Sequence, residues 1–250
     1  MARVAVIGNS GTGKSWGSGC LIERVLDPDH PDAPAETFDL AVHFDYEDEE
    51  VGLSETSGDY EPLMLRLDVD VDRATRINWR RLLLRRRRLR IVPDMTIPAA
   101  RELLFALSEA LMSICKDLRP GLTAFLSIDE AHNFVPQEVT DQRIHYLMSN
   151  GRKHGIEYLV ISQRPVSLHT SALGLTDRRL YFRVDEKNDL RGLREVATFD
   201  VNRLQGLDDR EVIVENKSSG ESVVESTESW TRLRPHYSGD DGVIDDALPI

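Results

Sequence analysis

A glycine-rich turn near the start of the sequence has the residue types and spacing of a phosphate-binding loop. Residues 8–15 match G-x-x-x-x-G-K-[ST] at every fixed position, between an apolar run and a helical pattern. Glycines let such a loop wrap an anion with backbone N–H groups, and the helix N-terminus adds partial positive charge. We expect Lys14 to reach the β- and γ-phosphates of a nucleoside triphosphate and Ser15 to bind Mg²⁺. The predicted ATP site comprises Gly8, Asn9, Ser10, Gly11, Thr12, Gly13, Lys14 and Ser15.

Two carboxylates follow a second apolar run. Asp129 and Glu130 directly follow residues 122–128. With a phosphate-binding loop upstream, we expect Asp129 to bind Mg²⁺ through water and Glu130 to polarise the attacking water as a general base. The alternative is a solvated strand end with a helix-capping acid. A general base at Glu130 favours hydrolysis over transfer to a small substrate.

Polar residues at the two ends of the next strand pattern, 156–162, are the other candidates. Gln163 follows this strand and places a polar side chain where a γ-phosphate could bind. There it could orient the attacking water and report phosphate release. Alternatively, Ser162 and Gln163 only form a turn, which would have the same sequence. Arg152 precedes the strand, at its opposite end, and could reach a nucleotide of an adjacent subunit. Alternatively, Arg152 lies at the C-terminus of a helix, where its positive charge interacts favourably with the helix dipole, and Gly155 caps that helix.

Short β-rich runs alternate with helical patterns, which predicts an α/β fold with a mainly parallel sheet flanked by helices. We expect strands at 2–7, 38–44, 89–92, 122–128, 156–162 and 180–184. We expect helices at 14–26, 78–84, 141–153 and 189–197, and a long helix that begins near Pro98 and has an apolar stripe ending at Leu118. A terminal β-hairpin is expected from residues 211–215 and 221–225. Residues 27–61 hold 13 carboxylates and no Lys or Arg, so we expect a solvated loop region around the strand at 38–44. The domain is predicted to span 1–229. A polar, acidic tail at 230–250 is expected to pack on a neighbour or stay loose.

Composition limits the function. The 250 residues carry a net charge of −12, which excludes a protein that coats nucleic acid by bulk attraction. There are only five lysines against 26 arginines; this Lys-poor, acid-rich balance suits a high-salt cytoplasm, although a GC-rich genome would also favour Arg. Cys20 and Cys115 are expected to be buried free thiols. No stretch is apolar enough to span a membrane and no signal peptide is evident, so we expect a soluble, intracellular protein.

Positive charge is concentrated in one run of seven arginines, at positions 80, 81, 85–88 and 90. Such a run could hold DNA phosphates. It could equally pair with the acidic stretch 27–61 of the same or the next subunit. It has no interleaved aromatic residues and so does not resemble a single-strand stacking platform.

Three motifs together resemble the HerA–FtsK superfamily of DNA-pumping ATPases, closest to its HerA branch. They are Asp129-Glu130-Ala131-His132-Asn133-Phe134, Gly151-Arg152-Lys153-His154-Gly155-Ile156 and Ile161-Ser162-Gln163-Arg164-Pro165. The likeness extends from residue 3 to about residue 184, with a weaker echo at 232–235. It implies a RecA-like core, a hexameric ring and double-stranded DNA threaded through the pore. It also implies Gln163 as a sensor and Arg152 as the trans-acting finger, with Arg164, Arg178 and Arg179 as competitors for the latter.

One departure from that superfamily narrows the expectation. HerA proteins typically carry an N-terminal β-barrel, for which a phosphate loop beginning at Gly8 leaves no room. The sequence most resembles the genome-packaging ATPases of tail-less, membrane-containing viruses, with a capsid vertex or nuclease as a further partner, and is expected in the cytoplasm or the virion. A plasmid or cellular motor fits equally well. A nucleotide-dependent switch is the alternative from another class. A small-molecule kinase, a GTPase and an ABC-type ATPase fit less well, since the guanine motif and the Leu-Ser-Gly-Gly-Gln signature are absent.

Overall fold

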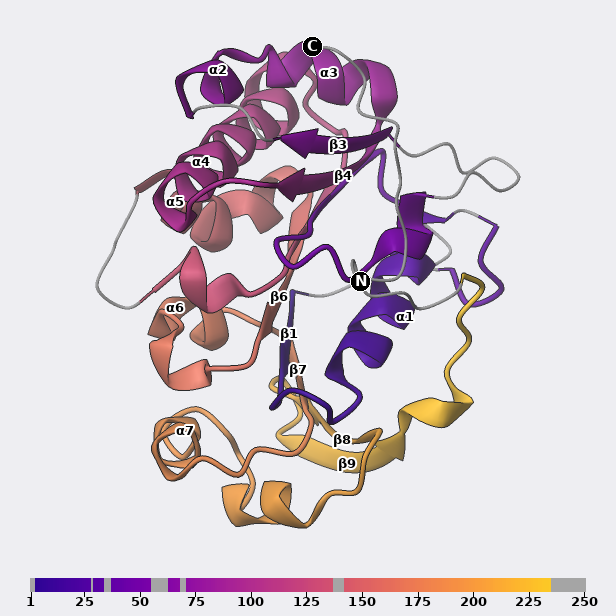
Figure 1. Ribbon diagram of the computed structural model, residues 1–250, viewed down its shortest axis with the longest axis vertical. Coiled ribbons are helices and arrows are strands. Elements are labelled where there is room, and N and C mark those ends of the chain that lie inside the picture. Colours follow the sequence, from indigo (N-terminus) through magenta and orange to yellow (C-terminus); the bar gives the residue numbers. More distant parts are fainter. Residues whose placement is uncertain are drawn as a thin grey trace.

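The computed structural model describes residues 3–27, 29–33, 37–54, 63–67, 71–136 and 142–234. They form a sheet in the order β3-β4-β2-β5-β6-β1-β7-β8-β9 (Figure 1). Neighbours from β3 to β7 are parallel, whereas β7–β8 and β8–β9 are antiparallel. The strands are β1 (Val4–Ile7), β2 (Leu40–Phe44), β3 (Leu63–Leu67), β4 (Arg88–Pro93), β5 (Ala124–Ile128), β6 (Ile156–Ser162), β7 (Arg178–Tyr181), β8 (Glu211–Asn216) and β9 (Glu221–Ser226).

Helices cover both faces of the sheet, because its central strands are apolar on both sides. In β1, Val4 and Val6 pack in the core on the α1 side, whereas Ala5 and Ile7 pack in the core that contains α3, α4 and α5. Figure 1 shows α1 on one side of the strands and α4, α5 and α6 on the other. The α-helices are α1 (Lys14–Leu26), α2 (Val71–Arg76), α3 (Trp79–Arg86), α4 (Ile97–Ser113), α5 (Gln142–Asn150), α6 (Thr170–Gly174) and α7 (Lys187–Leu193).

The strand order gathers the candidate residues at one edge of the sheet. In β2-β5-β6-β1, all four strands are parallel neighbours. Their carboxyl ends lead into the segment after Phe44, into Asp129, into Gln163 and into the glycine-rich loop, respectively. The carboxyl edge of an open parallel sheet is where ligands bind in such folds. The topology therefore brings four segments that are far apart in the sequence to one place.

The predicted α/β architecture with its terminal hairpin is confirmed, with local differences. β3 and α2 were not predicted. The expected apolar stripe of the long helix ends before Leu118, which is 51% exposed. α4 continues as a π-helical turn, Ile114–Leu118, and this change of helix type turns Leu118 away from the buried face. The helix at 141–153 ends at Asn150 and continues as a 3₁₀ turn, Gly151–His154, capped by Gly155 at φ 73°. Cys20 and Cys115 are buried free thiols, as predicted.

The prediction that 27–61 is a solvated loop region around the strand is wrong for three of its carboxylates, whereas Asp29, Asp32 and Glu47 are exposed as predicted. Asp27, Asp45 and Glu50 are all buried, at 1%, 0% and 4% exposure. Each lies against an arginine from elsewhere in the chain: Asp27 pairs with Arg234, Asp45 with Arg90 and Glu50 with Arg232. The Arg90–Asp45 pair is an instance of the predicted alternative, in which the arginine run pairs with the acidic stretch. The partners Arg232 and Arg234 lie outside that run and were not predicted.

Part of the predicted tail also packs on the domain. Leu233 and Arg234 donate their backbone N–H groups to the Glu23 carboxylate of α1, at 2.6 and 2.8 Å. Residues 235–250 lie outside the described part of the chain, and the boundary at 229 stays a prediction. None of the helices in the described residues is long and apolar enough to cross a membrane.

Candidate functional site

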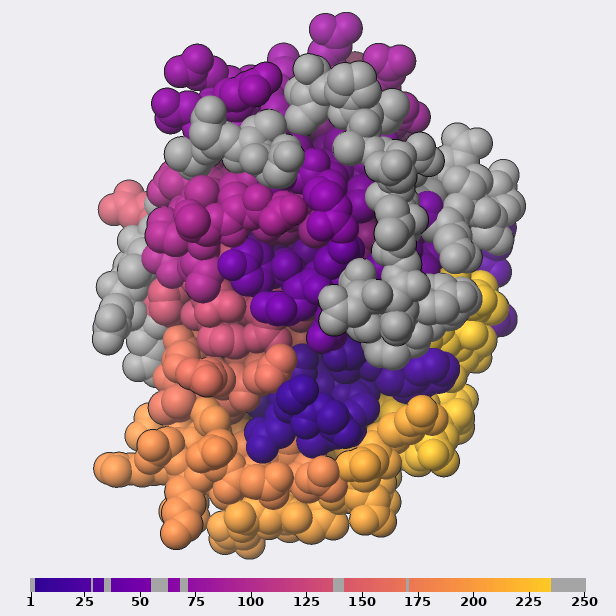
Figure 2. All heavy atoms as spheres, in the orientation of Figure 1, coloured from indigo at the N-terminus to yellow at the C-terminus, as the bar shows by residue number. Residues whose placement is uncertain are grey.

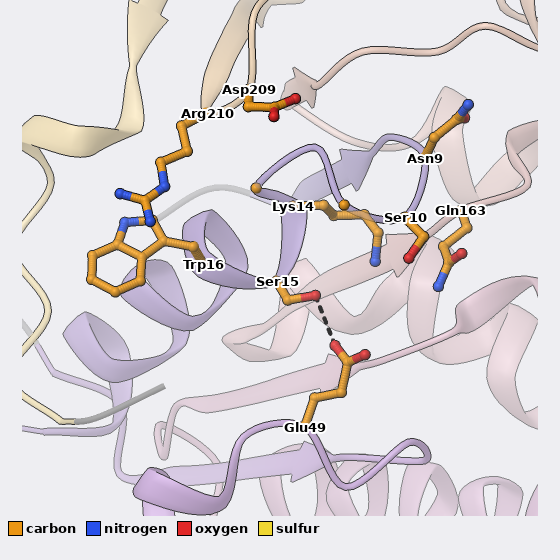
Figure 3. Close-up of a pocket in the computed structure, with 11 residues that line it drawn as sticks. Asn9, Ser10, Lys14, Ser15, Trp16, Glu49, Gln163, Asp209 and Arg210 are labelled. Carbon is orange, nitrogen blue, oxygen red and sulfur yellow. Dashed lines mark hydrogen bonds between the residues drawn. The ribbon is translucent and has the colours of Figure 1, made fainter. Parts of the chain in front are cut away.

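A pocket of about 470 Å³ opens at the carboxyl end of β1. The glycine-rich loop, Trp16, Glu49, Gln163, Asp209 and Arg210 line it (Figure 3). Lys14, Ser15 and Gln163 lie together on one side of it, whereas Trp16 and Arg210 lie side by side on the other. The pocket is thus polar at the end where the sequence predicts phosphates and aromatic at the far end.

The loop backbone requires glycine at two positions. Gly11 and Gly13 have φ angles of 77° and 90°, a left-handed conformation that other residues adopt at a cost. A Cβ on Gly13 would also lie 2.9 Å from Arg210 Cγ. Thr12 is buried, and its hydroxyl donates to the Asn9 carbonyl at 2.9 Å, which holds the loop closed across its base. This conformation leaves the first turn of α1 free to bind an anion.

Lys14 lies in the pocket close to Glu130. Its Nζ is 3.8 Å from Glu130 Oε1, and the two side chains are 3% and 6% exposed. Glu130 has a φ of 45°, an unusual value for a side-chain-bearing residue, which turns the chain sharply at the end of β5. Two residues that the sequence places on different motifs therefore meet in one buried ion pair.

Two further groups contact the Glu130 carboxylate. Gln163 Nε2 donates to Oε1 at 2.7 Å, and His132 Nδ1 lies 3.0 Å from Oε2. Burial raises the pKa of Glu130, opposed by Lys14 and by the Gln163 hydrogen bond. Burial lowers the pKa of His132 to about 4, so its ring is neutral at pH 7. His132 lies within the predicted motif, but its position against Glu130 was not predicted.

Asp129 is placed for a cation. Its side chain makes no hydrogen bond or ion pair with the described residues, although it is only 7% exposed, and its backbone N–H donates to Phe44 at 2.9 Å. Burial raises the pKa of Asp129 well above its usual range. Such an unpartnered buried carboxylate fits Mg²⁺, which takes one or two carboxylates plus phosphate oxygens and water.

Glu49 is the residue at this site that the sequence did not reveal. Ser15 Oγ donates to Glu49 Oε2 at 2.7 Å, so the predicted metal-binding hydroxyl already lies against a carboxylate. Glu49 follows β2, the strand beside β5. Carboxylates directly after a predicted strand are a usable signal, because the carboxyl ends of parallel strands meet at one edge.

The segment carrying Glu49 is fixed at both ends by buried arginines. Asp45 accepts from Arg90 Nε and Nη2 at 2.9 and 2.6 Å. It also accepts the backbone N–H groups of Glu49 and Glu50 at 3.2 and 3.0 Å. At the other end, Glu50 pairs with Arg232, whose side chain is 1% exposed. These contacts hold Glu49 beside Ser15.

Arg232 reaches Glu50 by lying directly on α1. A Cβ on Gly19 would lie 2.2 Å from Arg232 Nη1, so this helix position must be glycine for the guanidinium to fit. The guanidinium also lies over the Trp16 ring, 5.3 Å from its centroid, and that of Arg210 is 5.2 Å from the same centroid. Trp16 at the pocket is therefore in contact with two cations.

Arg152 lies away from these residues. It precedes β6, whereas Gln163 follows it, so the two are at opposite edges of the sheet. Its side chain is 64% exposed and pairs with Asp177 at 3.3 Å. Among its competitors, Arg179 is 3% exposed and bound to Glu215, which gives it a structural role. The structure thus leaves Arg152 on the surface, outside the pocket.

Comparisons with known proteins identify the fold. No family model matches the chain, and no curated protein matches its sequence. The genome packaging NTPase B204 of Sulfolobus turreted icosahedral virus 2, in complex with ATP-gammaS, superposes with a TM-score of 0.61 at 14% identity, over 90% of this chain and 97% of that chain. B204, the DNA-packaging ATPase of Sulfolobus turreted icosahedral virus, gives 0.60 at 16% identity, over 90% and 97%. VirB4 of Thermoanaerobacter pseudethanolicus gives 0.58 at 10% identity, over 90% and 88%.

At these identities the likeness is one of fold. The chain has the RecA-like P-loop NTPase fold of these proteins, as the motifs predict. The B204 proteins among these neighbours are described as a genome packaging NTPase and a DNA-packaging ATPase.

Proposed function

We propose that the protein is an ATP-hydrolysing motor that moves double-stranded DNA. The observation that carries this proposal is the contact of Lys14, Glu130 and Gln163 at the phosphate end of the pocket. A protein that only binds a nucleotide needs Lys14 but neither Glu130 nor Gln163. A carboxylate with a raised pKa, held by an amide beside a P-loop lysine, is what hydrolysis requires.

In this proposal the loop N–H groups hold the phosphates, and Lys14 turns from Glu130 to the β- and γ-phosphates. Glu130 then polarises the attacking water, and Gln163 orients it. Ser15 and Asp129 would hold Mg²⁺, with Glu49 as a further oxygen ligand, directly or through water. The metal would neutralise charge that develops on the phosphates. Arg152, exposed at the opposite edge of the sheet, would act on the nucleotide of an adjacent subunit in a ring, for which we propose six members.

The DNA-moving part rests on the neighbours. B204 is described as a genome packaging NTPase and a DNA-packaging ATPase, and it was crystallised with ATP analogues. We propose the corresponding role here, packaging the genome of a tail-less virus. The excess of Asp and Glu, with few lysines, suits a haloarchaeal host. A HerA-like cellular or plasmid motor is the alternative within the same class.

The experiment is the ATPase rate with and without double-stranded DNA, at low and at molar salt, with Lys14→Ala as the inactive control. We expect hydrolysis that DNA stimulates several-fold. Hydrolysis without stimulation at any salt would overturn the motor and favour a nucleotide-dependent switch. If the protein binds ATP but does not hydrolyse it, the proposed ATPase activity is overturned.

A further inference from the structure

The run of seven arginines has two structurally different parts. Arg88 and Arg90 belong to β4, and both are engaged internally: Arg88 donates to the backbone carbonyls of Leu26, Phe38 and Asp39, and Arg90 pairs with Asp45. The remaining five lie on α3 or just after it, and all five are exposed. We call them the α3 arginine surface: Arg80, Arg81, Arg85, Arg86 and Arg87.

The five guanidinium groups have no acidic partner within the described residues; none makes an ion pair or a hydrogen bond there. This contrasts with the acid-rich surroundings, since the whole chain carries 43 Asp and Glu against 31 Lys and Arg. α3 is held by its apolar residues instead: Trp79 and Leu83 are 3% and 0% exposed, and Asn78 caps the first turn by accepting from Arg81 N–H at 3.1 Å. The helix is therefore a fixed support for unpaired cations.

This surface is separate from the nucleotide pocket. α3 leads into the amino end of β4, and β4 is parallel to β2. The pocket lies at the carboxyl ends of the parallel strands, so Arg85, Arg86 and Arg87 lie toward the opposite edge of the sheet. In Figures 1 and 2, α3 forms part of the purple upper end of the molecule, distant from β1 and from the start of α1, where the glycine-rich loop lies.

The surface continues toward α4 and α5. Arg80 lines a hollow of about 430 Å³ with Lys116 and Arg143, where Glu109 and Asp117 are the acids. Lys116 lies 5.4 Å from the ring centroid of Tyr146. Arg143 pairs with Glu102 at 2.9 Å, so it is not one of the unpaired cations. Five unpaired arginines on and just after one helix suit an elongated polyanion better than a small anion.

We propose that the α3 arginine surface binds the phosphate backbone of double-stranded DNA. The inference deepens the proposed motor function and rests on it for the choice of DNA. A guanidinium presents a planar fork that matches phosphate oxygens, and uncompensated cations release condensed counterions when they bind DNA. The aromatic residue of α3, Trp79, is buried, and the exposed Tyr146 lies beside Lys116 and not among the five arginines, so the arginines are not interleaved with the aromatic residues that a single-strand site would require. The contact is therefore with the backbone of a duplex and independent of sequence.

The test compares three proteins by fluorescence anisotropy with a short labelled duplex over a range of salt, without nucleotide. One carries Arg81→Gln, Arg85→Gln and Arg86→Gln. The matched control removes the same charge from the opposite end of the molecule, with Arg191→Gln, Arg194→Gln and Arg203→Gln, all exposed positions. We expect the α3 variant to bind at least about tenfold more weakly at low salt, with the log–log salt slope reduced by about 2 to 3, since each phosphate contact contributes about 0.9. The control keeps the wild-type slope.

Further measurements separate the possible failures. Changing the same three α3 positions to Lys keeps the charge and should retain most of the slope, and equal melting temperatures establish that the variants fold. ATP binding and the basal ATPase rate should be unchanged in the α3 variant. If the wild type binds DNA but the α3 variant binds it equally well, this inference fails and the motor stands. If the wild type binds no duplex at any salt, both fail. If the α3 substitutions change the mass of the DNA-free protein in sedimentation, the surface is a contact between copies, and the DNA assignment is overturned.

Discussion

Gln163 Nε2 donates a hydrogen bond to the same Glu130 oxygen that lies 3.8 Å from Lys14 Nζ. One carboxylate oxygen therefore contacts both an uncharged and a charged donor. A γ-phosphate entering the pocket would draw Lys14 away and leave Glu130 held by Gln163 and His132. This makes the occupancy of the pocket and the environment of Glu130 interdependent.

Glu130→Gln should bind ATP and fail to hydrolyse it. Removing a positioned general base lowers rates by about 10²- to 10⁴-fold, whereas the phosphate-binding loop is untouched. Single-turnover hydrolysis and equilibrium binding of a fluorescent ATP analogue measure the two effects separately. Glu221→Gln, at an exposed acid in the β8–β9 hairpin, is the control. Normal turnover by Glu130→Gln would exclude the general-base role.

Gln163→Ala should lower kcat and leave the KM for ATP almost unchanged. Its side chain contacts Glu130, and we assign it to the water and not to the nucleotide. A steady-state ATP titration with wild type and variant gives both constants. A large rise in KM with unchanged kcat would show instead that Gln163 serves to bind the nucleotide.

Lys14→Ala should abolish nucleotide binding, which loss of the ATP-induced rise in melting temperature would report. Mixing its subunits with those of Arg152→Ala should restore some ATPase activity. A Lys14→Ala subunit can present its intact Arg152 to the intact loop of an Arg152→Ala neighbour, whereas the reverse interface lacks both groups. The recovered ATPase activity is measured as a function of the mixing ratio. Mixtures of Lys14→Ala with Lys153→Ala subunits, in which Arg152 is intact, serve as the comparison. Absence of recovery at every ratio would count against Arg152 as the trans-acting residue.

Gly19→Ala should destabilise the protein, although alanine normally favours a helix by about 1 kcal/mol. The added Cβ would overlap Arg232 Nη1 and displace the guanidinium from Glu50. Breaking a buried ion pair costs about 3–5 kcal/mol, so we expect a net loss of about 2–4 kcal/mol in urea unfolding and a change in Trp16 fluorescence. Gly192→Ala, in α7, has only ordinary contacts with Val166 and should be neutral or stabilising. Equal stability of Gly19→Ala and wild type would show that Arg232 packs elsewhere.

Acidification should destabilise the fold through His43. The side chain is fully buried, both ring nitrogens lack hydrogen bonds, and burial lowers its pKa to about 4 even though Asp45 lies 3.7 Å away, with Arg90 opposing. The unfolded chain, with a His pKa of about 6.5, binds the proton more readily. Stability is therefore intact above pH 6.5 and decreases as the pH falls toward 4, by up to about 3 kcal/mol.

The corresponding measurement is urea unfolding of wild type and His43→Gln at pH 7.5 and pH 5. Subtracting the two pH dependences removes the opposite contribution of Glu50, whose pKa burial raises against the attraction of Arg232. The variant should lose less stability on acidification. Parallel pH dependences would mean that His43 has the same pKa in the folded and the unfolded chain, which would contradict the prediction.

Local patterns predicted the site residues that belong to short motifs. The loop at 8–15, Asp129, Glu130 and Gln163 follow their strands directly, so identifying the strands was enough to place them at one edge. Arg232 could not be placed in this way, and the rule could not single out Glu49 from the other carboxylates that follow Phe44. Their positions depend on contacts with Ser15 and Glu50, made by segments that are distant in sequence. β3 was missed because five apolar-rich residues between acidic stretches carry too little periodicity to distinguish strand from loop.

The arginine run shows the same limit for charge. Arg86 and Arg90 are only four residues apart, yet one is exposed on α3 and the other is wholly buried in β4. Counting cations cannot separate them. What separates them is the change from helix to strand at Arg87, together with an aspartate, Asp45, that the sheet brings beside β4.

The contact of Arg232 with α1 has a consequence for biosynthesis. Arg232 and Trp16 are 216 residues apart, and the guanidinium completes the support of Glu50 beside the phosphate loop. During translation, the segment after the hairpin must leave the ribosome before Glu49 can be fixed against Ser15. A nascent chain would therefore fold most of its sheet while its nucleotide pocket was still incomplete, and ATP binding would begin only when nearly all of the described chain had been made.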